Sequence, residues 1–400
     1  MWTESVISYL VIKEKGYLVL SDTVLLKNDT SKTPRQSNLE LFRIISMLLI
    51  VAHHYVVNSG LTAADGPIVA DMLSARSLFL ITFGAWGKVG INCFMFITGY
   101  FMCKSKLTSR KYVKLLGEVM FYKIVLYFVF LALGVIAFSP KDFVLKMLPV
   151  DSVSDMFTSS FLIFYLLIPF LNILINHLTE LQHIKLIILC CFTYVVLGCI
   201  PVITVVMNYV TWFTVLYFIS SYIRLYPKKI FNKTCLWGIL SIASVAISVV
   251  SIIVLAYIGN KRGAVLSYWF LYDSNKILAV IVAFSAFMFF KNVRIPYSKF
   301  INTVAASCFG VLLLHASSVT REWLWYDVVD SIGAYSSKYM YIYAIGTVLA
   351  IFVVCTVIDI LRIRFIETPF MKLWDKLYPG ILKRYKSAEL KFCKIFGINS

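Results

Sequence analysis

Long apolar stretches separated by short polar segments dominate the chain from Leu41 onward. A helix that crosses a bilayer uses about 20 apolar residues, so these stretches predict membrane-spanning helices. The boundary between the fifth and sixth is the least distinct, because only Pro201 and Asn208 interrupt the apolar run there. We predict an all-α, polytopic membrane helix bundle of about ten transmembrane helices, at residues 41–58, 81–102, 115–138, 157–176, 184–206, 209–224, 235–258, 272–290, 301–319 and 341–363.

The first 38 residues follow a different pattern. Their apolar runs are short and are interrupted by charged residues such as Lys13, Glu14 and Asp22. None is long enough to span a bilayer, and the segment lacks the basic, apolar and small-residue order of a secretory signal. We therefore predict a cytoplasmic N-terminal appendage at 1–38, a transmembrane domain at 39–374 and a basic cytoplasmic tail at 375–400.

Composition supports a membrane protein, with 60% hydrophobic and 14% charged residues. The formal net charge of +18 is compatible with nucleic acid, an anionic surface or membrane topology as its cause. When both termini are placed in the cytoplasm, most of the 38 Lys and Arg residues fall on the cytoplasmic side, as the positive-inside rule requires. We therefore predict two cytoplasmic termini, a lipid bilayer around the helices and no nucleic-acid partner.

The predicted outer loops are short, so chemistry is expected inside or at the rim of the helix bundle. The nine Cys residues are scattered mainly through apolar spans, without a C-x-x-C pair or a His/Cys spacing that suits a metal. We interpret them as small packing residues and predict no disulfide and no metal site.

Ionisable residues inside the predicted spans are the first functional candidates, because charge is costly in hydrocarbon. Arg43 and His54 are eleven residues apart, which places them within about 20° on one helix face and about 16 Å apart along its axis. Arg43 alone is equally explained as an anchor at the membrane surface. Packing explains two adjacent histidines, His53 and His54, less well, because each imidazole has a donor and an acceptor to satisfy.

Other polar residues complete the candidate set. His315, Lys123 and Asp359 lie within predicted spans, and Glu118 and Glu367 lie near the cytoplasmic boundary. We expect Glu367 to pair with a cytoplasmic Lys or Arg and to close the last helix. His177 and His183 fall in a short predicted inner loop, where solvated surface residues are expected.

Arg43 and His54, with ten residues between them, resemble the R-X10-H signature of the membrane acyltransferase 3 family. The resemblance continues in order along most of the chain, from Asn38 to about Trp374. Residues 89–100, 164–172 and 216–224 are similar to the second, fourth and sixth helices of the family, 307–315 to its F-G-I-Y-L-I-H segment, and 366–369 to its terminal E-x-P. The chain departs from the family pattern at Thr98 in place of Ser, at Leu312 in place of Tyr, and at Ala316-Ser317 in place of Asp-Asn.

The resemblance implies a bacterial O-acetyltransferase of the inner membrane that acts in the biosynthesis of cell-envelope polysaccharides. Such an enzyme transfers an acetyl or other small acyl group from cytoplasmic acetyl-CoA, its acyl-donor substrate, to a sugar hydroxyl of a lipid-linked or cell-surface glycan. The chemistry needs a base for that hydroxyl and cations for the CoA phosphates.

We expect His54 to act as the general base and Arg43 to act with it. Supporting roles are expected for His53, His315 and Asn92, although His315 is equally explained as a structural histidine and Asn92 as an interhelical link. For the donor we expect Arg43 and the basic segment between the second and third spans, with Arg110, Lys111 and Lys114 foremost. Topology alone would also place positive charge in that segment.

Two other kinds of function suit a bundle of this size. A carrier or flippase for lipid-linked sugars often shows an internal half-repeat and helices broken by Gly or Pro at matching positions, and the sequence shows neither. A polysaccharide polymerase needs a sizeable outer loop, which the predicted topology lacks.

Overall fold

The computed structural model describes residues 35–152 and 157–397. The chain divides into two units, Met1–Arg35 and Gln36–Ser400. Residues 1–34 of the predicted appendage lie outside the described residues. Helices and loops make up the described part of the second unit, without a strand, which confirms the all-α prediction.

The first half of this unit contains α2 (Ser37–Val57), α3 (Pro67–Ala70), α4 (Ala75–Gly84), α5 (Gly87–Met102), α6 (Ser109–Ala132), α7 (Pro140–Met147), α8 (Phe157–His177), α9 (Glu180–Cys191), η2 (Phe192–Val196) and η3 (Leu197–Cys199). The second half contains α10 (Tyr209–Leu225), η4 (Lys229–Asn232), α11 (Thr234–Arg262), α12 (Ile277–Asn292), α13 (Lys299–Ala306), α14 (Cys308–His315), α15 (Ser318–Glu322), η5 (Trp323–Val328), α16 (Ser331–Tyr335), α17 (Met340–Arg362), η6 (Ile363–Glu367) and α18 (Thr368–Phe396).

Seven helical runs in the described part of the chain are long and apolar enough to cross a membrane. An eighth candidate is the pair Lys299–His315 and Ser318–Val328, which is bent by 72°. Each of the ten predicted spans coincides with a helix, but α10 and α12 have only 17 and 16 residues, fewer than the usual length of about 20. The chain is a multi-pass membrane protein, whereas the count of ten and the cytoplasmic termini remain predictions.

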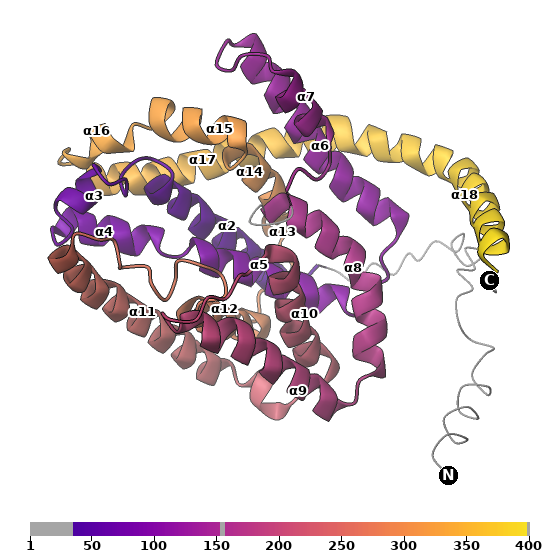
Figure 1. Ribbon diagram of the computed structural model, residues 1–400, viewed down its shortest axis with the longest axis horizontal. Helices are drawn as coiled ribbons and strands as arrows, with labels where there is room; N and C mark the ends of the chain where they lie inside the picture. The colour runs from indigo at the N-terminus through magenta and orange to yellow at the C-terminus, as the bar shows by residue number, and fades with distance from the viewer. Residues whose placement is uncertain (1–34, 153–156, 398–400) are drawn as a thin grey trace. The chain divides into compact units, whose positions relative to one another are not determined.

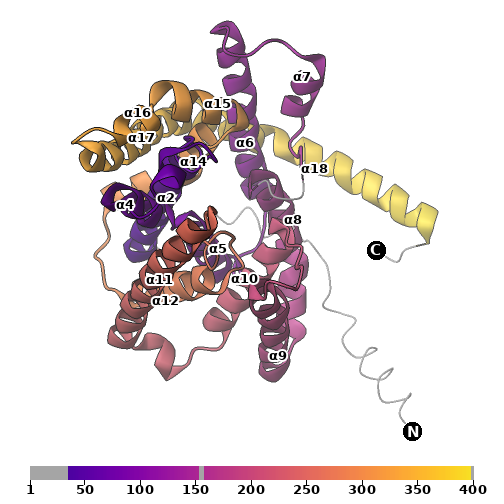
Figure 2. The ribbon, with the colours of Figure 1, turned by 60° about the vertical axis from the view of Figure 1, so that its left-hand side comes forward.

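Two helices, α2 and α5, form the interior of the bundle. They contact each other, and α2 also contacts α17 while α5 contacts α10 and α12. In Figures 1 and 2, α2 and α4 lie between α17 on one side and α11 and α12 on the other. The outer helices α9 and α11 expose apolar side chains such as Ile188 (61%) and Ile242 (74%), as contact with lipid requires.

Glycine allows α2 and α5 to pack closely. A Cβ atom at Gly90 would lie 2.6 Å from the backbone oxygen of Ser46, and one at Gly87 would lie 2.3 Å from Cγ of His53. Small residues let the backbones of membrane helices approach each other in this way. The histidine pair on α2 is therefore held directly against the start of α5.

Three sequence-based placements need correction or extension. Arg110, Lys111 and Lys114, predicted in a connecting loop, belong to α6, which begins at Ser109 because the Thr108 side chain accepts the Lys111 N–H and caps the helix. His183, predicted as a solvated residue, is fully buried, because α9 packs on α10 and places its Nε2 atom 3.0 Å from the Phe218 oxygen. The predicted tail at 375–400 continues α18 as far as Phe396.

Candidate active site

The last turns of α2 border a cavity of about 620 Å³. Both His53 and His54 line it, and α5, α6, α7, α10 and α15 each contribute side chains. A cavity of this size accommodates a small molecule or a sugar unit. Its polar and aromatic lining includes Asn58, Lys88, Tyr122, Lys123, Lys146, Asp151, Ser159, Tyr209, Tyr268, Tyr272, Ser318 and Arg321.

His54 makes a direct contact with a second histidine. Its Nδ1 atom lies 3.0 Å from Nε2 of His315, which is fully buried on α14. Nδ1 of His315 lies 2.6 Å from the backbone oxygen of Val311. Both histidines were candidates from the sequence, and the fold brings them together from positions 261 residues apart.

This contact determines which ring nitrogens carry protons. A carbonyl oxygen only accepts hydrogen bonds, so Nδ1 of His315 donates to Val311, and Nε2 of a neutral His315 is an acceptor. Nδ1 of His54 must then donate to His315. In the neutral His54 ring, Nε2 is left without a proton and is able to act as a base.

His53 is held separately from this pair. Its Nδ1 atom lies 2.6 Å from the Gly84 oxygen at the end of α4, so that nitrogen donates its proton to the carbonyl. His53 also lines the cavity, and Gly87 packs against its ring. It is therefore a second imidazole of fixed orientation at the same wall.

Two other predicted residues, Arg43 and Asn92, lie away from the cavity lining. The Arg43 guanidinium donates to Glu40 at 2.9 Å and lies over the Phe94 ring at 5.7 Å. Asn92 is buried, donates to the Ser274 oxygen at 2.7 Å and accepts from the Trp212 indole at 2.9 Å. The Asn92 side chain thus links α5 to α10 and to the segment before α12.

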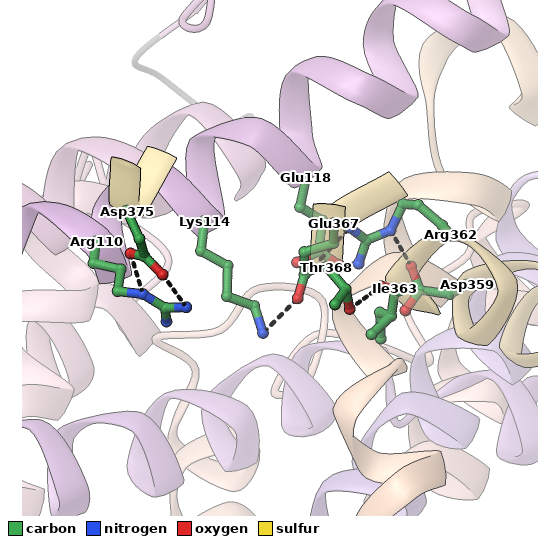
Figure 3. A network of polar contacts seen from close by, with 9 residues as sticks. All are labelled: Arg110, Lys114, Glu118, Asp359, Arg362, Ile363, Glu367, Thr368 and Asp375. Carbon is green, nitrogen blue, oxygen red and sulfur yellow. Dashed lines mark hydrogen bonds and ion pairs between the residues drawn. The ribbon is translucent and has the colours of Figure 1, made fainter. Parts of the chain in front are cut away.

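The cations predicted to bind the donor lie at the start of α6 and contact other parts of the chain. Arg110 donates to both carboxylate oxygens of Asp375, at 2.8 and 3.2 Å, and Lys114 pairs with Glu367 at 2.8 Å, as Figure 3 shows. Lys111 donates to the Ser105 hydroxyl at 2.5 Å. None of the three lines the cavity around His54.

Arg362 is the centre of a buried ionic cluster and was not predicted from the sequence. It is 4% exposed and contacts the carboxylates of Glu118 at 3.1 Å, Asp359 at 2.7 Å and Glu367 at 2.9 Å, as part of the network in Figure 3. The predicted pairing of Glu367 with a Lys or Arg is confirmed. The cluster joins α6, α17 and η6, and the Tyr122 hydroxyl links it to the cavity wall by donating to Asp359 at 2.7 Å.

Asp151, in the segment between α7 and α8, is a carboxylate of the cavity lining itself. It accepts from the Ser159 hydroxyl at 2.7 Å and from Lys123 at 3.1 Å. Burial disfavours its ionised form, but the hydrogen bonds from Ser159 and Lys123 outweigh burial and lower the pKa of Asp151. These contacts attach the segment to α6 and α8.

The described residues include no group of three or more His, Cys, Asp or Glu side chains able to hold a metal ion. A family model with the description "Acyltransferase domain" matches residues 36–359. The match extends from the start of α2 nearly to the end of α17, so it contains the histidine pair and most of the cavity lining. No curated protein and no solved structure matches the chain.

Proposed function

Because the chain belongs to the acyltransferase 3 family, we propose that this membrane acyltransferase is an O-acyltransferase of the bacterial inner membrane with a glycan acceptor. It transfers an acetyl or other small acyl group from cytoplasmic acyl-CoA to a sugar hydroxyl of a lipid-linked or cell-surface glycan. Membership of the family and the apolar helices carry the coarser conclusion. The acceptor, the donor and the base are parts of the proposal.

The hydrogen-bonded chain from His54 through His315 to Val311 is the observation that supports the mechanism. It leaves Nε2 of His54 as the basic nitrogen of a residue that lines a cavity. Nε2 takes the proton of the acceptor hydroxyl while the hydroxyl oxygen forms a bond to the thioester carbon. The carbon–sulfur bond then breaks, and the imidazolium returns the proton to the CoA sulfur.

The position of Arg43 supports its proposed role in donor binding. Arg43 precedes His54 by three turns of α2, which corresponds to about 16 Å along the axis. A CoA molecule is long enough to place its phosphates near Arg43 and the cations of α6 while its thioester lies near His54. Phosphates favour arginine because the guanidinium makes two parallel hydrogen bonds.

The test is an acyl-transfer assay with labelled acetyl-CoA and the glycan of the host, in membranes that contain the protein. His54→Ala is expected to lower kcat by roughly 10²- to 10⁴-fold, the usual contribution of a general base. His177→Ala is a matched control, because His177 is exposed at the end of α8 and its ring contacts only its own helix, at Ile173. Full activity of His54→Ala, or no ester-linked label with the wild type, would overturn the proposal.

A further inference from the structure

The cavity contains four cations that the proposed mechanism does not use. Lys88, Lys123, Lys146 and Arg321 line it together with His54, and Asp151 is the one carboxylate in the described lining. With neutral histidines, the ionisable side chains of the cavity therefore carry an excess of positive charge. This excess surrounds the place where the acceptor hydroxyl must meet its base.

The four cations come from separate elements: Lys88 from α5, Lys123 from α6, Lys146 from α7 and Arg321 from α15. In the topology predicted from the sequence, Lys88, Lys146 and Arg321 lie on the outer side of the membrane. The positive-inside rule places cations on the other side, so topology does not account for them. Their convergence on one cavity calls for a local cause.

The single carboxylate is already engaged. Asp151 pairs with Lys123 at 3.1 Å, and Lys123 also donates to the Leu148 oxygen at 2.7 Å. Lys88 donates to the Tyr209 hydroxyl at 2.9 Å and lies 3.8 Å from an oxygen of Asp273, the longest ion pair found in the described chain. These two cations thus have partial compensation from the protein.

Lys146 and Arg321 have less. Lys146 donates to a neutral group, the Ser318 hydroxyl, at 2.7 Å. The Arg321 guanidinium forms no hydrogen bond or ion pair with any residue that the structure describes. Burial lowers the pKa of Lys146, which shows that its surroundings do not fully offset the loss of water. Both positions would gain from a bound anion.

The aromatic lining fits the same ligand. Tyr209, Tyr268, Tyr272 and Phe157 all border the cavity. Aromatic rings offer apolar faces to the C–H groups of a sugar, and the tyrosine hydroxyls offer polar contacts at the edge. Cations and aromatic rings in one cavity suit a sugar that bears a negative group.

We propose that this cavity binds an anionic acceptor, in which a phosphate or carboxylate group near the acylated hydroxyl contacts Lys146 and Arg321. The inference rests on the proposed acyl transfer and specifies its substrate class. A phosphate would come from the lipid link of the glycan, and a carboxylate from an acidic sugar. Both accept charge-assisted hydrogen bonds from lysine and arginine, which are strong where water is excluded.

The first experiment measures binding to the purified full-length protein without any acyl donor. The probes are glucose 1-phosphate, glucuronate and glucose, and tighter binding of the phosphate or of the carboxylate identifies the source of the charge. Arg321→Gln and Lys146→Gln are each expected to weaken binding of the preferred anionic probe by roughly ten- to 100-fold, the range for one hydrogen bond to a charged group. Lys141→Gln is the matched control, since Lys141 is an exposed cation of the same short helix as Lys146 but does not line the cavity.

The second experiment separates this inference from the proposed function. In the acyl-transfer assay, Arg321→Gln is expected to raise the KM of the glycan and to leave the KM of acetyl-CoA unchanged. A raised KM for acetyl-CoA alone would show that the cations bind the donor, which would overturn the anionic acceptor while acyl transfer stands. Equal binding of glucose and the two charged probes would also overturn it. Since the binding measurement needs no turnover, a failed transfer assay would reject the proposed function by itself.

Discussion

Nδ1 of His54 lies 3.0 Å from Nε2 of His315, so His315 acts on the acceptor only through His54 and is a positioning residue. His315→Phe keeps a ring but loses the acceptor for the His54 proton, and we expect kcat to fall roughly tenfold or more with little change in either KM. His315→Gln supplies an amide oxygen in place of Nε2 and is expected to recover part of kcat. An equal loss of activity and of folded protein in both variants would instead indicate a purely structural histidine.

Arg43 is predicted to contact the donor, although Glu40 is its partner in the structure. If the guanidinium binds CoA phosphates, Arg43→Ala raises the KM of acetyl-CoA by roughly ten- to 100-fold, the value of a charge-assisted hydrogen bond. Glu40→Gln removes the partner but keeps the cation, so the KM of the donor should stay close to that of the wild type. A fall in protein abundance alone, with both KM values unchanged, would identify Arg43 as a membrane anchor.

Arg362 is expected to be essential for stability. Arg362→Met leaves the carboxylates of Glu118, Asp359 and Glu367 without their shared cation, and removal of one partner from a buried pair costs about 3–5 kcal/mol. Arg110→Met is the control, because Arg110 and Asp375 are 56% and 48% exposed and exposed pairs contribute at most about 1 kcal/mol. Unfolding of the purified protein by denaturant in detergent measures both, and similar losses in the two variants would refute this ranking.

Gly310 permits the close approach of α14, which carries His315, to α17. A Cβ atom there would lie 2.1 Å from Oδ1 of Asp359, so Gly310→Ala is expected to lower the free energy of unfolding by about 1–3 kcal/mol, the usual cost of overpacking. Gly346 on α17 has open space around the same position, and Gly346→Ala should be neutral or slightly stabilising, because alanine favours helix. The two melting temperatures test the contact, which an unchanged value for Gly310→Ala would exclude.

Asp151 predicts one acid-dependent contribution to stability. Its pKa in the folded protein is below the ordinary value of 3.8, so the unfolded chain binds more protons and stability rises with pH between the folded and the unfolded pKa. The contribution is complete above the unfolded value and is lost as the pH falls through the folded value. Asp151→Asn should reduce the loss of unfolding free energy between about pH 5 and about pH 3, and an identical pH dependence in both proteins would contradict the prediction.

The helices were predictable because each apolar stretch is continuous, and all ten predicted spans coincide with helices. Their ends were less accessible to sequence reasoning. The span expected at 81–102 is two helices, α4 and α5, with a break at Ala85 and Trp86, since an apolar break leaves no mark on a hydropathy pattern. Likewise, α6 begins at Ser109 rather than near 115 because a threonine cap, and not the first apolar residue, starts it.

At the site, the sequence supplied the candidates but not their pairing. His54 and His315 were both selected as polar groups in hydrocarbon, yet only the fold shows their contact. Arg362 was missed because it looked like one more cytoplasmic charge after the last span. The cavity cations Lys146 and Arg321 escaped attention for the opposite reason, since each stood alone in a short outer segment.

The close packing of α2 and α5 has a consequence for how the acceptor range can diversify. At Gly87 and Gly90 an added methyl group would meet the ring of His53 and the backbone at Ser46, so the wall that holds the base has almost no freedom to change shape. Lys146 and Arg321 belong instead to short helices at the rim, α7 and α15. New acceptor specificities are therefore expected to arise by exchange of these rim segments around an unchanged pair of inner helices.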